Sequence, residues 1–221
     1  MNLSIVIPTL DAAATLPRTL AALGPQDDII VVDGGSDDAT VAIARESGAR
    51  LEAAPMGRGM QLQAGAETAR GDWLLFLHAD TVLEAGWRES VVSFCGDPTN
   101  RWRAAVFRFA LDDESAQARR LERLVAWRVR WMGLPYGDQG LLISRAFYDR
   151  LGGFRLLTLM EDVDMVRRIG GKRLTVLPIS ARTSAARWRR DGWTRRSLRN
   201  LACLTLYFLG VPPQVIRRVY G

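Results

Sequence analysis

The chain has 221 residues, 48% of them hydrophobic, a length that suits one large domain or one domain with an appendage. Its net charge of +6 is uneven, because residues 1–110 carry 9 basic and 14 acidic side chains and residues 111–221 carry 21 and 10. The acidic first half argues against a nucleic-acid surface there, and the basic second half suits an anionic partner such as lipid headgroups or a phosphorylated acceptor. An arginine-rich composition explains the charge equally well.

The cysteines and the apolar runs indicate in which cellular compartment the protein resides. Cys95 and Cys203 lie in apolar stretches and make neither a disulfide framework nor a zinc spacing, so we expect a reducing, cytoplasmic compartment. The first residues carry no basic segment before their apolar run, and we expect no signal peptide. No apolar run reaches the roughly 18 residues of a membrane span.

Strands and helices alternate in the first eighty residues. Short apolar runs predict strands at residues 3–8, 28–33, 49–54 and 72–78. Helical spacing between them predicts helices at residues 14–24, 38–48 and 57–71. This order predicts parallel strands joined by right-handed crossovers, with helices on both faces of the sheet.

Small and polar residues follow each of these predicted strands, at residues 8–9, 33–36, 55–59 and 78–80. Ligands of such sheets bind beyond the carboxyl ends of the strands. We therefore expect four separate pieces of chain to converge on one binding rim.

The second half of the chain is less regular. We expect strands at residues 103–111 and 173–178, helices at residues 114–133 and 160–171, and a loop, a short strand and a helix within residues 137–154. Acids at the start of residues 160–171 and basic residues at their end suit the helix macrodipole.

His78 is the only histidine, and it stands two residues before Asp80 at the end of a predicted buried strand. A carboxylate in a site without cysteine suits a hard divalent cation held partly by substrate phosphates, and the imidazole favours manganese slightly over magnesium. The alternative is that Asp80 caps the next helix and His78 is a polar strand end.

Two further stretches flank this pair. The glycines of residues 33–38, DGGSDD, let the backbone approach a ligand, and Asp33 can accept hydrogen bonds from a base or a ribose. An ordinary glycine-rich turn is the alternative. Arg58, followed by Gln61 and Gln63, begins a predicted helix at the same rim and can reach a diphosphate, unless it is a solvated surface arginine.

Residues 160–164, MEDVD, place three carboxylates at a helix start, more than capping requires. Glu161 and Asp164 share a face by their spacing of three, so Asp162 points elsewhere. A general base must be ionised and within reach of an acceptor hydroxyl. The alternative is a favourable placement of acids in a first helical turn.

Taken together, these stretches resemble glycosyltransferase family 2, whose members have the GT-A fold. The resemblance covers about residues 1–180 and rests on SIVIPTLDAAATLPRTL, VVDGGSDDAT, GRGMQLQAGAETARGDWLLFLHADT, GDQGLLISRAFYDRLGGF and MEDVDMVRRI, in that order. The FLHADT, GDQG and TSAARWRRDGW stretches further resemble a bacterial subgroup, the radical-SAM/selenodomain-associated transferases. The resemblance implies an α/β, Rossmann-like, mostly parallel sheet flanked by helices. Residues 181–221 are then a helical, basic appendage packed on the core or at a membrane surface.

The resemblance also implies roles by position. A nucleotide-diphosphate sugar, such as a UDP-sugar, would be bound by Pro8, Thr9, Asp11, Asp33, Ser36, Arg58, Gln61, Asp80 and Asp138. Asp80 and His78 would hold manganese or magnesium, with His78 in place of the first carboxylate of the family's Asp-x-Asp motif. In the Glu161-Asp162 pair, Asp162 would be the catalytic base. Asp11-Ala12 departs from the Asn-Glu that is common in the family.

The implied reaction is a single in-line displacement with inversion at the anomeric carbon, in which Asp162 deprotonates the acceptor hydroxyl. Two alternatives stay open. A sugar-phosphate nucleotidyltransferase usually carries a glycine-rich signature near its first strand, where this chain has TLDAAAT. A nucleotide-sugar-binding or membrane-scaffold protein with a decayed site is the second.

Residues 198–211 are largely apolar and flanked by arginines, and they are too short to span a bilayer. One interpretation places them in a membrane interface, which suits a lipid-linked acceptor and a position at the inner face of the membrane. The other packs them as a helix on the core or on a second subunit, because Pro212-Pro213 would end such a helix abruptly.

Overall fold

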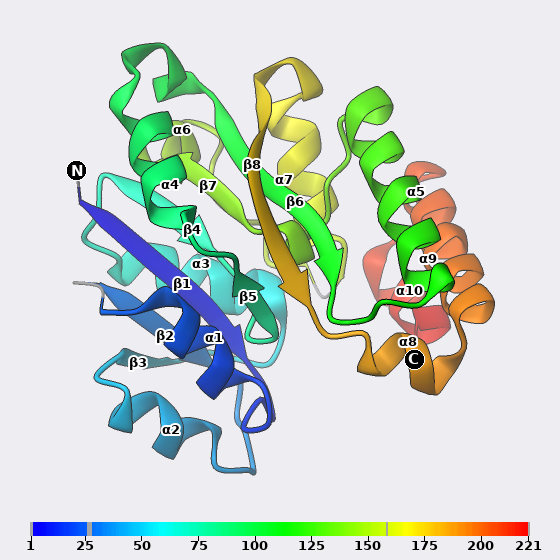
Figure 1. Ribbon diagram of the computed structural model, residues 1–221, viewed down its shortest axis with the longest axis horizontal. Helices are drawn as coiled ribbons and strands as arrows, with labels where there is room; N and C mark the ends of the chain where they lie inside the picture. Colours follow the sequence, from blue (N-terminus) through cyan, green and yellow to red (C-terminus); the bar gives the residue numbers. More distant parts are fainter. Residues whose placement is uncertain (1, 26–27, 158, 221) are drawn as a thin grey trace.

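An eight-stranded sheet forms the centre of the computed structural model, which describes residues 2–25, 28–157 and 159–220 (Figure 1). The strand order is β3-β2-β1-β4-β7-β6-β8-β5. The strands are β1 (Leu3–Thr9), β2 (Ile29–Asp33), β3 (Arg50–Ala53), β4 (Trp73–Phe76), β5 (Thr81–Leu83), β6 (Ala104–Leu111), β7 (Leu141–Ser144) and β8 (Leu174–Thr183).

Helices pack on both faces of this sheet, and further helices follow in the C-terminal part of the chain. The helices are α1 (Leu16–Leu23), α2 (Thr40–Glu46), α3 (Arg58–Thr68), α4 (Trp87–Gly96), α5 (Ala116–Met132), α6 (Arg145–Arg150), α7 (Glu161–Ile169), α8 (Ala186–Asp191), α9 (Trp193–Phe208) and α10 (Pro213–Tyr220). Short 3-10 helices are η1 (Pro98–Trp102), η2 (Gly137–Gln139) and η3 (Gly171–Arg173).

The predicted parallel arrangement of the first half is confirmed. β1 pairs in parallel with β2 and β4, and β2 pairs in parallel with β3. The second half is mixed, since β7 runs antiparallel to β4 and β6, whereas β6 and β8 are parallel. The α/β fold with a mostly parallel sheet, which the sequence predicted, is therefore the fold of the chain.

The observed elements differ from the expected ones at β5, α4 and β8. No element was expected at β5 or α4, and β8 is longer than residues 173–178. β5 is three residues long and is held by pairing with residues 181–183 of β8, about a hundred positions later in the chain. This long-range pairing also extends β8 to Thr183, so the predicted domain boundary after residue 180 falls within a strand. The division into two domains stays a prediction.

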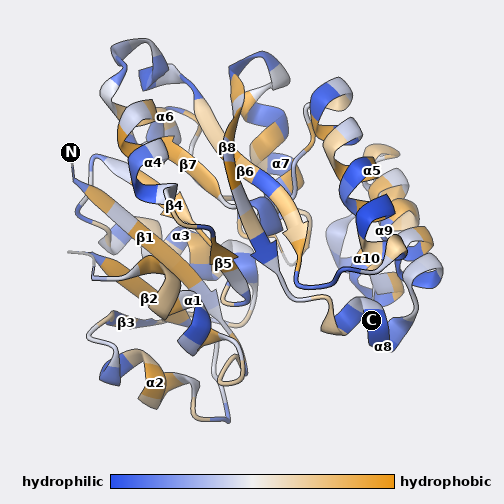
Figure 2. Ribbon diagram, viewed as in Figure 1, coloured by the Kyte–Doolittle hydropathy of each residue, from blue (hydrophilic) through white to orange (hydrophobic). Residues whose placement is uncertain are grey.

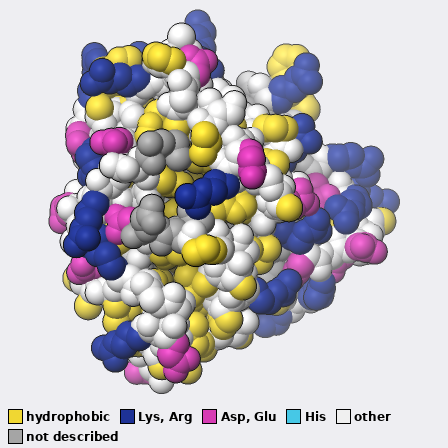
Figure 3. All heavy atoms as spheres, turned by 60° about the vertical axis from the view of Figure 1, so that its left-hand side comes forward, with side chains coloured by type: hydrophobic (Ala, Val, Ile, Leu, Met, Phe, Trp, Pro, Cys, Tyr) yellow, Lys and Arg dark blue, Asp and Glu magenta, His cyan; other side chains and the backbone are white. Residues whose placement is uncertain are grey.

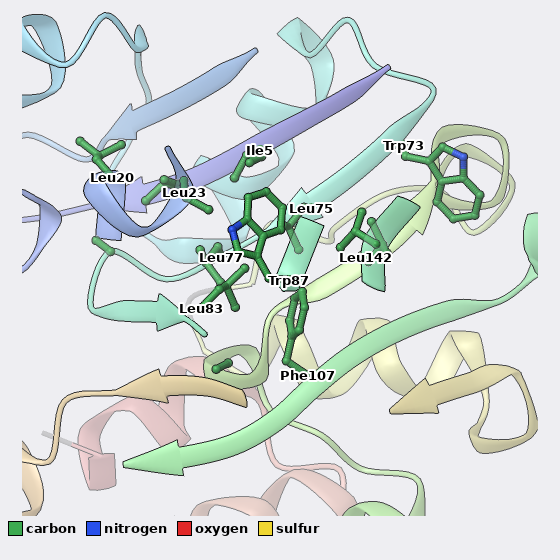
Figure 4. Close-up of a cluster of buried hydrophobic side chains, with 14 of the residues drawn as sticks. Ile5, Leu20, Leu23, Trp73, Leu75, Leu77, Leu83, Trp87, Phe107 and Leu142 are labelled. Atoms are coloured by element: carbon green, nitrogen blue, oxygen red, sulfur yellow. The ribbon is translucent and has the colours of Figure 1, made fainter. Parts of the chain in front are cut away.

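The alternation of β1 explains why the sheet carries two cores. Ile5 and Ile7 point into the cluster with α1 and α4, while Val6 points into the opposite cluster with α3, α6 and α7. Figure 4 shows the first cluster, where Trp87 of α4 lies among side chains from the central strands. Side chains on both faces of the central strands are therefore buried.

The C-terminal helices gather at one side of the sheet, next to α5 (Figure 1). Trp188 and Trp193 pack against a small cluster formed by β6 and α5, and Cys203 and Ile216 form another with Leu159. Within the described residues, none of the helices has the length and apolar character needed to cross a bilayer. The space-filling view shows many basic side chains toward its right-hand edge (Figure 3).

Gly65 lets α3 approach the sheet closely. A Cβ atom at this position would lie 2.3 Å from Cγ1 of Val6 and 2.8 Å from Cγ2 of Val32. We expect Gly65→Ala to lower the free energy of unfolding by ~1–3 kcal/mol through overpacking, measured by urea denaturation. Gly96→Ala is the matched control, because nothing lies within 4 Å of its added Cβ atom. Equal effects of both substitutions would contradict this account of the α3 packing.

Candidate active site

Asp33 organises the loops at the carboxyl ends of β1 and β2. Its Oδ1 accepts hydrogen bonds from the hydroxyls of Thr9 and Ser36, and its Oδ2 accepts from the backbone N–H groups of Gly35 and Ser36, both at 2.9 Å. Burial opposes ionisation of Asp33, but these bonds outweigh it and lower the pKa of the carboxyl. Asp33 is thus ionised, and both of its carboxylate oxygens already accept hydrogen bonds within the loops that it joins.

Asp11 ties the loop after β1 to the loop after β2. Its backbone N–H donates to Ser36 Oγ at 2.9 Å, and its Oδ1 accepts from the N–H of Asp37 at 3.0 Å. The backbone of Asp11 has a φ of 49°, in the left-handed region that non-glycine residues rarely adopt. Pro8 lies buried in β1 opposite Val32.

Gln61 supports the same loops from beneath. It is 3% exposed, and its Nε2 donates to the carbonyl oxygens of Thr9 and Val32 at 2.7 and 2.9 Å. Both amide protons are used by the ends of β1 and β2. Gln61 therefore holds strand ends in place, whereas Gln63 bonds to Tyr148 and Glu67 away from this cluster.

We call these loops, with Pro8, Thr9, Asp11, Asp33, Ser36 and Gln61, the loop cluster. A separate cleft brings five other predicted site residues together. Its wall includes Arg58 at the start of α3, His78 and Asp80 after β4, Asp138 in η2 and Asp162 in α7. The opposite wall comes from the C-terminal helices and was not predicted from the sequence. It includes Arg187, Trp188, Arg196, Asn200, Cys203 and Tyr220.

Gly137 sets the spacing between the imidazole and the predicted base. Its backbone N–H donates to Oδ2 of Asp162 at 2.8 Å. A Cβ atom on Gly137 would lie 2.6 Å from Nε2 of His78 and 3.5 Å from Oδ2 of Asp162. The absence of a side chain at this position therefore lets His78 and Asp162 face the same short segment of backbone.

Glu161 and Asp162 have separate roles because they point in different directions. The Glu161 side chain is 1% exposed and forms an ion pair with Arg58, with 2.9 Å between Oε1 and Nε. Burial raises the pKa of Glu161 against the attraction of Arg58, and the charge of Glu161 raises the pKa of Arg58. Asp164 is buried like Glu161, as their spacing of three predicts, and pairs with Arg155 and Arg168.

Two other groups in the cleft have perturbed acidities. Burial, with the nearby charges of Arg58 and Arg187, lowers the pKa of His78 to about 4, so the imidazole is neutral at pH 7. Burial raises the pKa of Asp138 to about 6, opposed by the charge of Arg128. Arg128 itself lies over the ring of Tyr136, 3.5 Å from its centre.

Unfavourable backbone conformations occur in the loop after β1 and just before α7. Among the described residues, Asp11 and Met160 are the two non-glycine positions with positive φ, and Met160, at 67°, immediately precedes Glu161. Such conformations cost on the order of 1–3 kcal/mol each and cluster where function requires them. The strain therefore supports the importance of the loop cluster and of the start of α7.

The predicted site residues form two groups. The first is the loop cluster of Pro8, Thr9, Asp11, Asp33, Ser36 and Gln61, and the second is the cleft group of Arg58, His78, Asp80, Asp138 and Asp162, with Glu161 beneath it. The Thr19 hydroxyl donates to the carbonyl oxygen of Ala79 at 2.9 Å and so ties α1 to the strand end that carries Asp80. For the unpredicted C-terminal wall, the sequence offered one signal, the adjacent Arg187 and Trp188.

The cleft fits a metal ion that is held partly by a substrate. No cluster of three or more His, Cys, Asp or Glu side chains arranged for a metal occurs within the described residues. Magnesium usually takes only one or two protein carboxylates and completes its shell with phosphates and water. Asp80 and the neutral imidazole of His78 suit that kind of incomplete site.

Comparison with known proteins identifies the family. The sequence profile described as Glycosyl transferase family 2 matches residues 4–157. The chain belongs to glycosyl transferase family 2, as the motifs predicted. This membership decides against the nucleotidyltransferase alternative.

One relative is a PGL/p-HBAD biosynthesis glycosyltransferase of Mycobacterium bovis (strain BCG / Pasteur 1173P2), 39% identical over 106 residues. The match covers 42% of this chain and 41% of that protein. The chain therefore matches well under half the length of this relative.

Two solved structures share the GT-A fold. S. aureus TarS is 15% identical with a TM-score of 0.64, over 93% of this chain and 40% of that one. Glucosyl-3-phosphoglycerate synthase from Mycobacterium tuberculosis, in complex with Mn2+ and UDP-glucose, is 18% identical with a TM-score of 0.62, over 96% and 80%. At these identities the likeness shows the fold alone.

The raised pKa of Asp138 predicts a pH-dependent stability difference. A carboxyl whose pKa is higher in the folded than in the unfolded protein destabilises the fold once it ionises. The free energy of unfolding therefore falls as pH rises from the unfolded pKa of ~4 to the folded pKa of about 6. Asp138→Asn should therefore raise the melting temperature of metal-free protein at pH 8, and this gain should shrink toward pH 4. Asp149→Asn, at an exposed position, is the control. A gain of equal size at both pH values would contradict the assignment.

Proposed function

We propose that the protein is an inverting glycosyltransferase that moves a sugar from a nucleotide-diphosphate sugar to an acceptor hydroxyl. The observation that carries this proposal is the convergence of Asp162, His78 and Asp80 on one cleft, with Asp162 and His78 both beside Gly137. A carboxylate near a candidate phosphate-binding site is what a direct displacement requires.

The donor lies, in this proposal, between the loop cluster and the cleft. The nucleoside occupies the loop cluster around Asp11, Asp33 and Ser36, and the diphosphate extends toward Asp80. The link from Thr19 to Ala79 supports this path, because it connects α1, next to the loop cluster, with the strand end that carries Asp80. We favour UDP as the nucleotide, since a neighbour of the same fold was solved with UDP-glucose.

A divalent cation, manganese or magnesium, would be held by Asp80 and His78 and would neutralise charge on the diphosphate. His78 suits this role because its lowered pKa keeps the imidazole unprotonated at pH 7. A neighbour of the same fold was solved with Mg2+ and UDP, which supports a cation of this type.

Asp162 acts as the base in the proposed reaction. The acceptor oxygen forms a bond to the anomeric carbon as the bond from that carbon to the phosphate oxygen breaks. The hydroxyl proton passes to the Asp162 carboxylate, and the electron pair leaves with the nucleoside diphosphate. Arg187 helps to stabilise that leaving group, because it is exposed in the cleft and pairs with no carboxylate among the described residues. Arg58 contributes less charge, since Glu161 already neutralises it.

The acceptor is proposed to be lipid-linked, and the protein to touch the inner face of a membrane. Exposed Leu198, Leu201 and Leu209 on or just after α9, with five arginines and no acid in residues 192–220, support a lipid surface nearby. We also propose membership of the radical-SAM/selenodomain-associated subgroup, on the FLHADT and GDQG stretches.

Replacing the proposed catalytic base, Asp162, should lower the rate of sugar transfer without weakening nucleotide binding. We expect Asp162→Asn to lower the rate of transfer ~10²–10⁴-fold, because a positioned general base contributes about that much. Nucleotide affinity should stay within about twofold. The measurement is sugar transfer to an added acceptor, or slow donor hydrolysis, beside calorimetric binding of the nucleotide. Asp149→Asn serves as the carboxylate control, and unchanged turnover in Asp162→Asn would remove Asp162 from the mechanism.

A thermal-shift panel tests the donor and the cation. Ligands that bind only the folded state raise the melting temperature by mass action. We expect UDP or a UDP-sugar with manganese to raise it, and expect chelator or Asp80→Asn to abolish the rise. A rise that survives chelator would keep the donor site and exclude Asp80 and His78 as metal ligands. The absence of any rise with UDP-, GDP- and dTDP-sugars would reject the proposed donor site.

A further inference from the structure

The outer face of α5 is unusually apolar for a surface helix. Leu124, Trp127 and Trp131 are 63%, 57% and 69% exposed and recur at a spacing of three and four, which places them along one side of the helix. The opposite side packs on the core through Val125 and Val129. α5 is thus apolar on two sides, and among the residues that the structure describes only the inner side packs on other elements.

The polar residues beside this stripe are almost all arginines. α5 contains five arginines and one acid, Glu122, which Arg119 already pairs. Arg120, Arg123 and Arg130 form no ion pair with a carboxylate in the part of the chain that the structure describes. Arg130 instead lies against the ring of Trp131, 5.7 Å from its centre. Figure 2 shows the resulting mixture of strongly hydrophilic and hydrophobic residues along α5.

The neighbouring helix continues this character. Trp193, in the first turn of α9, packs against the cluster that α5 forms with β6. Beyond it, α9 exposes Leu198 and Leu201 at 61% and 58%, and residues 192–220 contain five arginines and no acid. The positive charge beside the exposed apolar residues therefore extends from α5 to α9.

The charge selects between the possible occupants of this surface. A second copy of the chain would bring like charge against like charge, because residues 111–221 carry 21 basic and 10 acidic side chains. A bilayer with anionic headgroups is complementary to both features at once. Tryptophan favours the boundary between headgroups and acyl chains, and arginine favours the headgroup phosphates.

We propose that the outer face of α5, defined by Leu124, Trp127 and Trp131 with the flanking Arg120, Arg123 and Arg130, docks the protein on an anionic lipid bilayer. None of these residues lines the candidate active cleft. The proposal gives the membrane contact a defined surface outside the C-terminal segment, and it does not depend on the transfer chemistry. Its failure and the failure of the proposed function are therefore distinguishable.

Vesicle sedimentation of the full chain tests this surface. We expect binding to vesicles of phosphatidylcholine mixed with phosphatidylglycerol, and weak binding to phosphatidylcholine alone. Raising the salt from ~0.1 to ~1 M should weaken the binding, because the Debye length falls from about 10 to about 3 Å. The double variant Trp127→Ala/Trp131→Ala should lose at least roughly tenfold in partitioning, since it removes two large aromatic surfaces that the bilayer would cover.

Trp102→Ala is the matched control. Trp102 is also partly exposed, at 40%, and also lies beside arginines, Arg101 and Arg150, but it belongs to η1 rather than to α5. The Trp102→Ala variant should bind vesicles like the wild type.

The double variant should keep the wild-type far-ultraviolet circular dichroism and the same melting-temperature rise with nucleotide, because its substituted side chains are exposed. Wild-type tryptophan fluorescence should be quenched by brominated lipid, and the double variant should lose most of that quenching.

Three results would overturn the proposal. The first is wild-type protein that stays in the supernatant with anionic vesicles. The second is equal vesicle binding by the wild type and the folded double variant. The third is a concentration-dependent dimer in light scattering that the double variant abolishes, without vesicle binding, since it would assign this face to a second copy.

Discussion

The ion pair between Arg58 and Glu161 is the interaction on which the arrangement of the candidate site depends. It joins the first residue of α3, in the parallel half of the sheet, to the first residue of α7, in the mixed half. A carboxylate as buried as Glu161 is stable only with a partner of opposite charge. Because a helix turns by about 100° per residue, fixing Glu161 inward also fixes Asp162 toward the cleft. The pair therefore orients the proposed base without touching the reaction.

Close backbone approaches complete this arrangement. A side chain on Gly59 would lie 2.5 Å from the carbonyl oxygen of Arg155, so glycine lets the segment before α7 cross the start of α3. Gly137 plays a comparable part between His78 and Asp162. In both places glycine has no side chain, which allows segments from distant parts of the chain to approach each other closely.

The sequence was informative wherever a signal is local. Short apolar runs separated by helical stretches predicted the parallel strands, and the polar strand ends predicted both the loop cluster and His78 with Asp80. Three features depend on partners far along the chain and left no local signal: the pairing of β5 with β8, the burial of Gln61 beneath Thr9, and the ion pair that occupies Arg58. The wall formed by α8, α9 and α10 was missed although Arg187 and Trp188 are adjacent in the sequence. Its residues are spread over more than thirty positions and meet only when three helices pack together.

The position of that wall in the chain has a consequence for synthesis. The loop cluster is made within the first 61 residues, and the cleft group is complete once Asp162 has been added. Tyr220 of α10 lines the same cleft, so the second wall cannot form until almost sixty further residues have been synthesised. Domains fold progressively as the chain emerges, so the residues of the cleft group and those of the opposite wall are added to the nascent chain at different times.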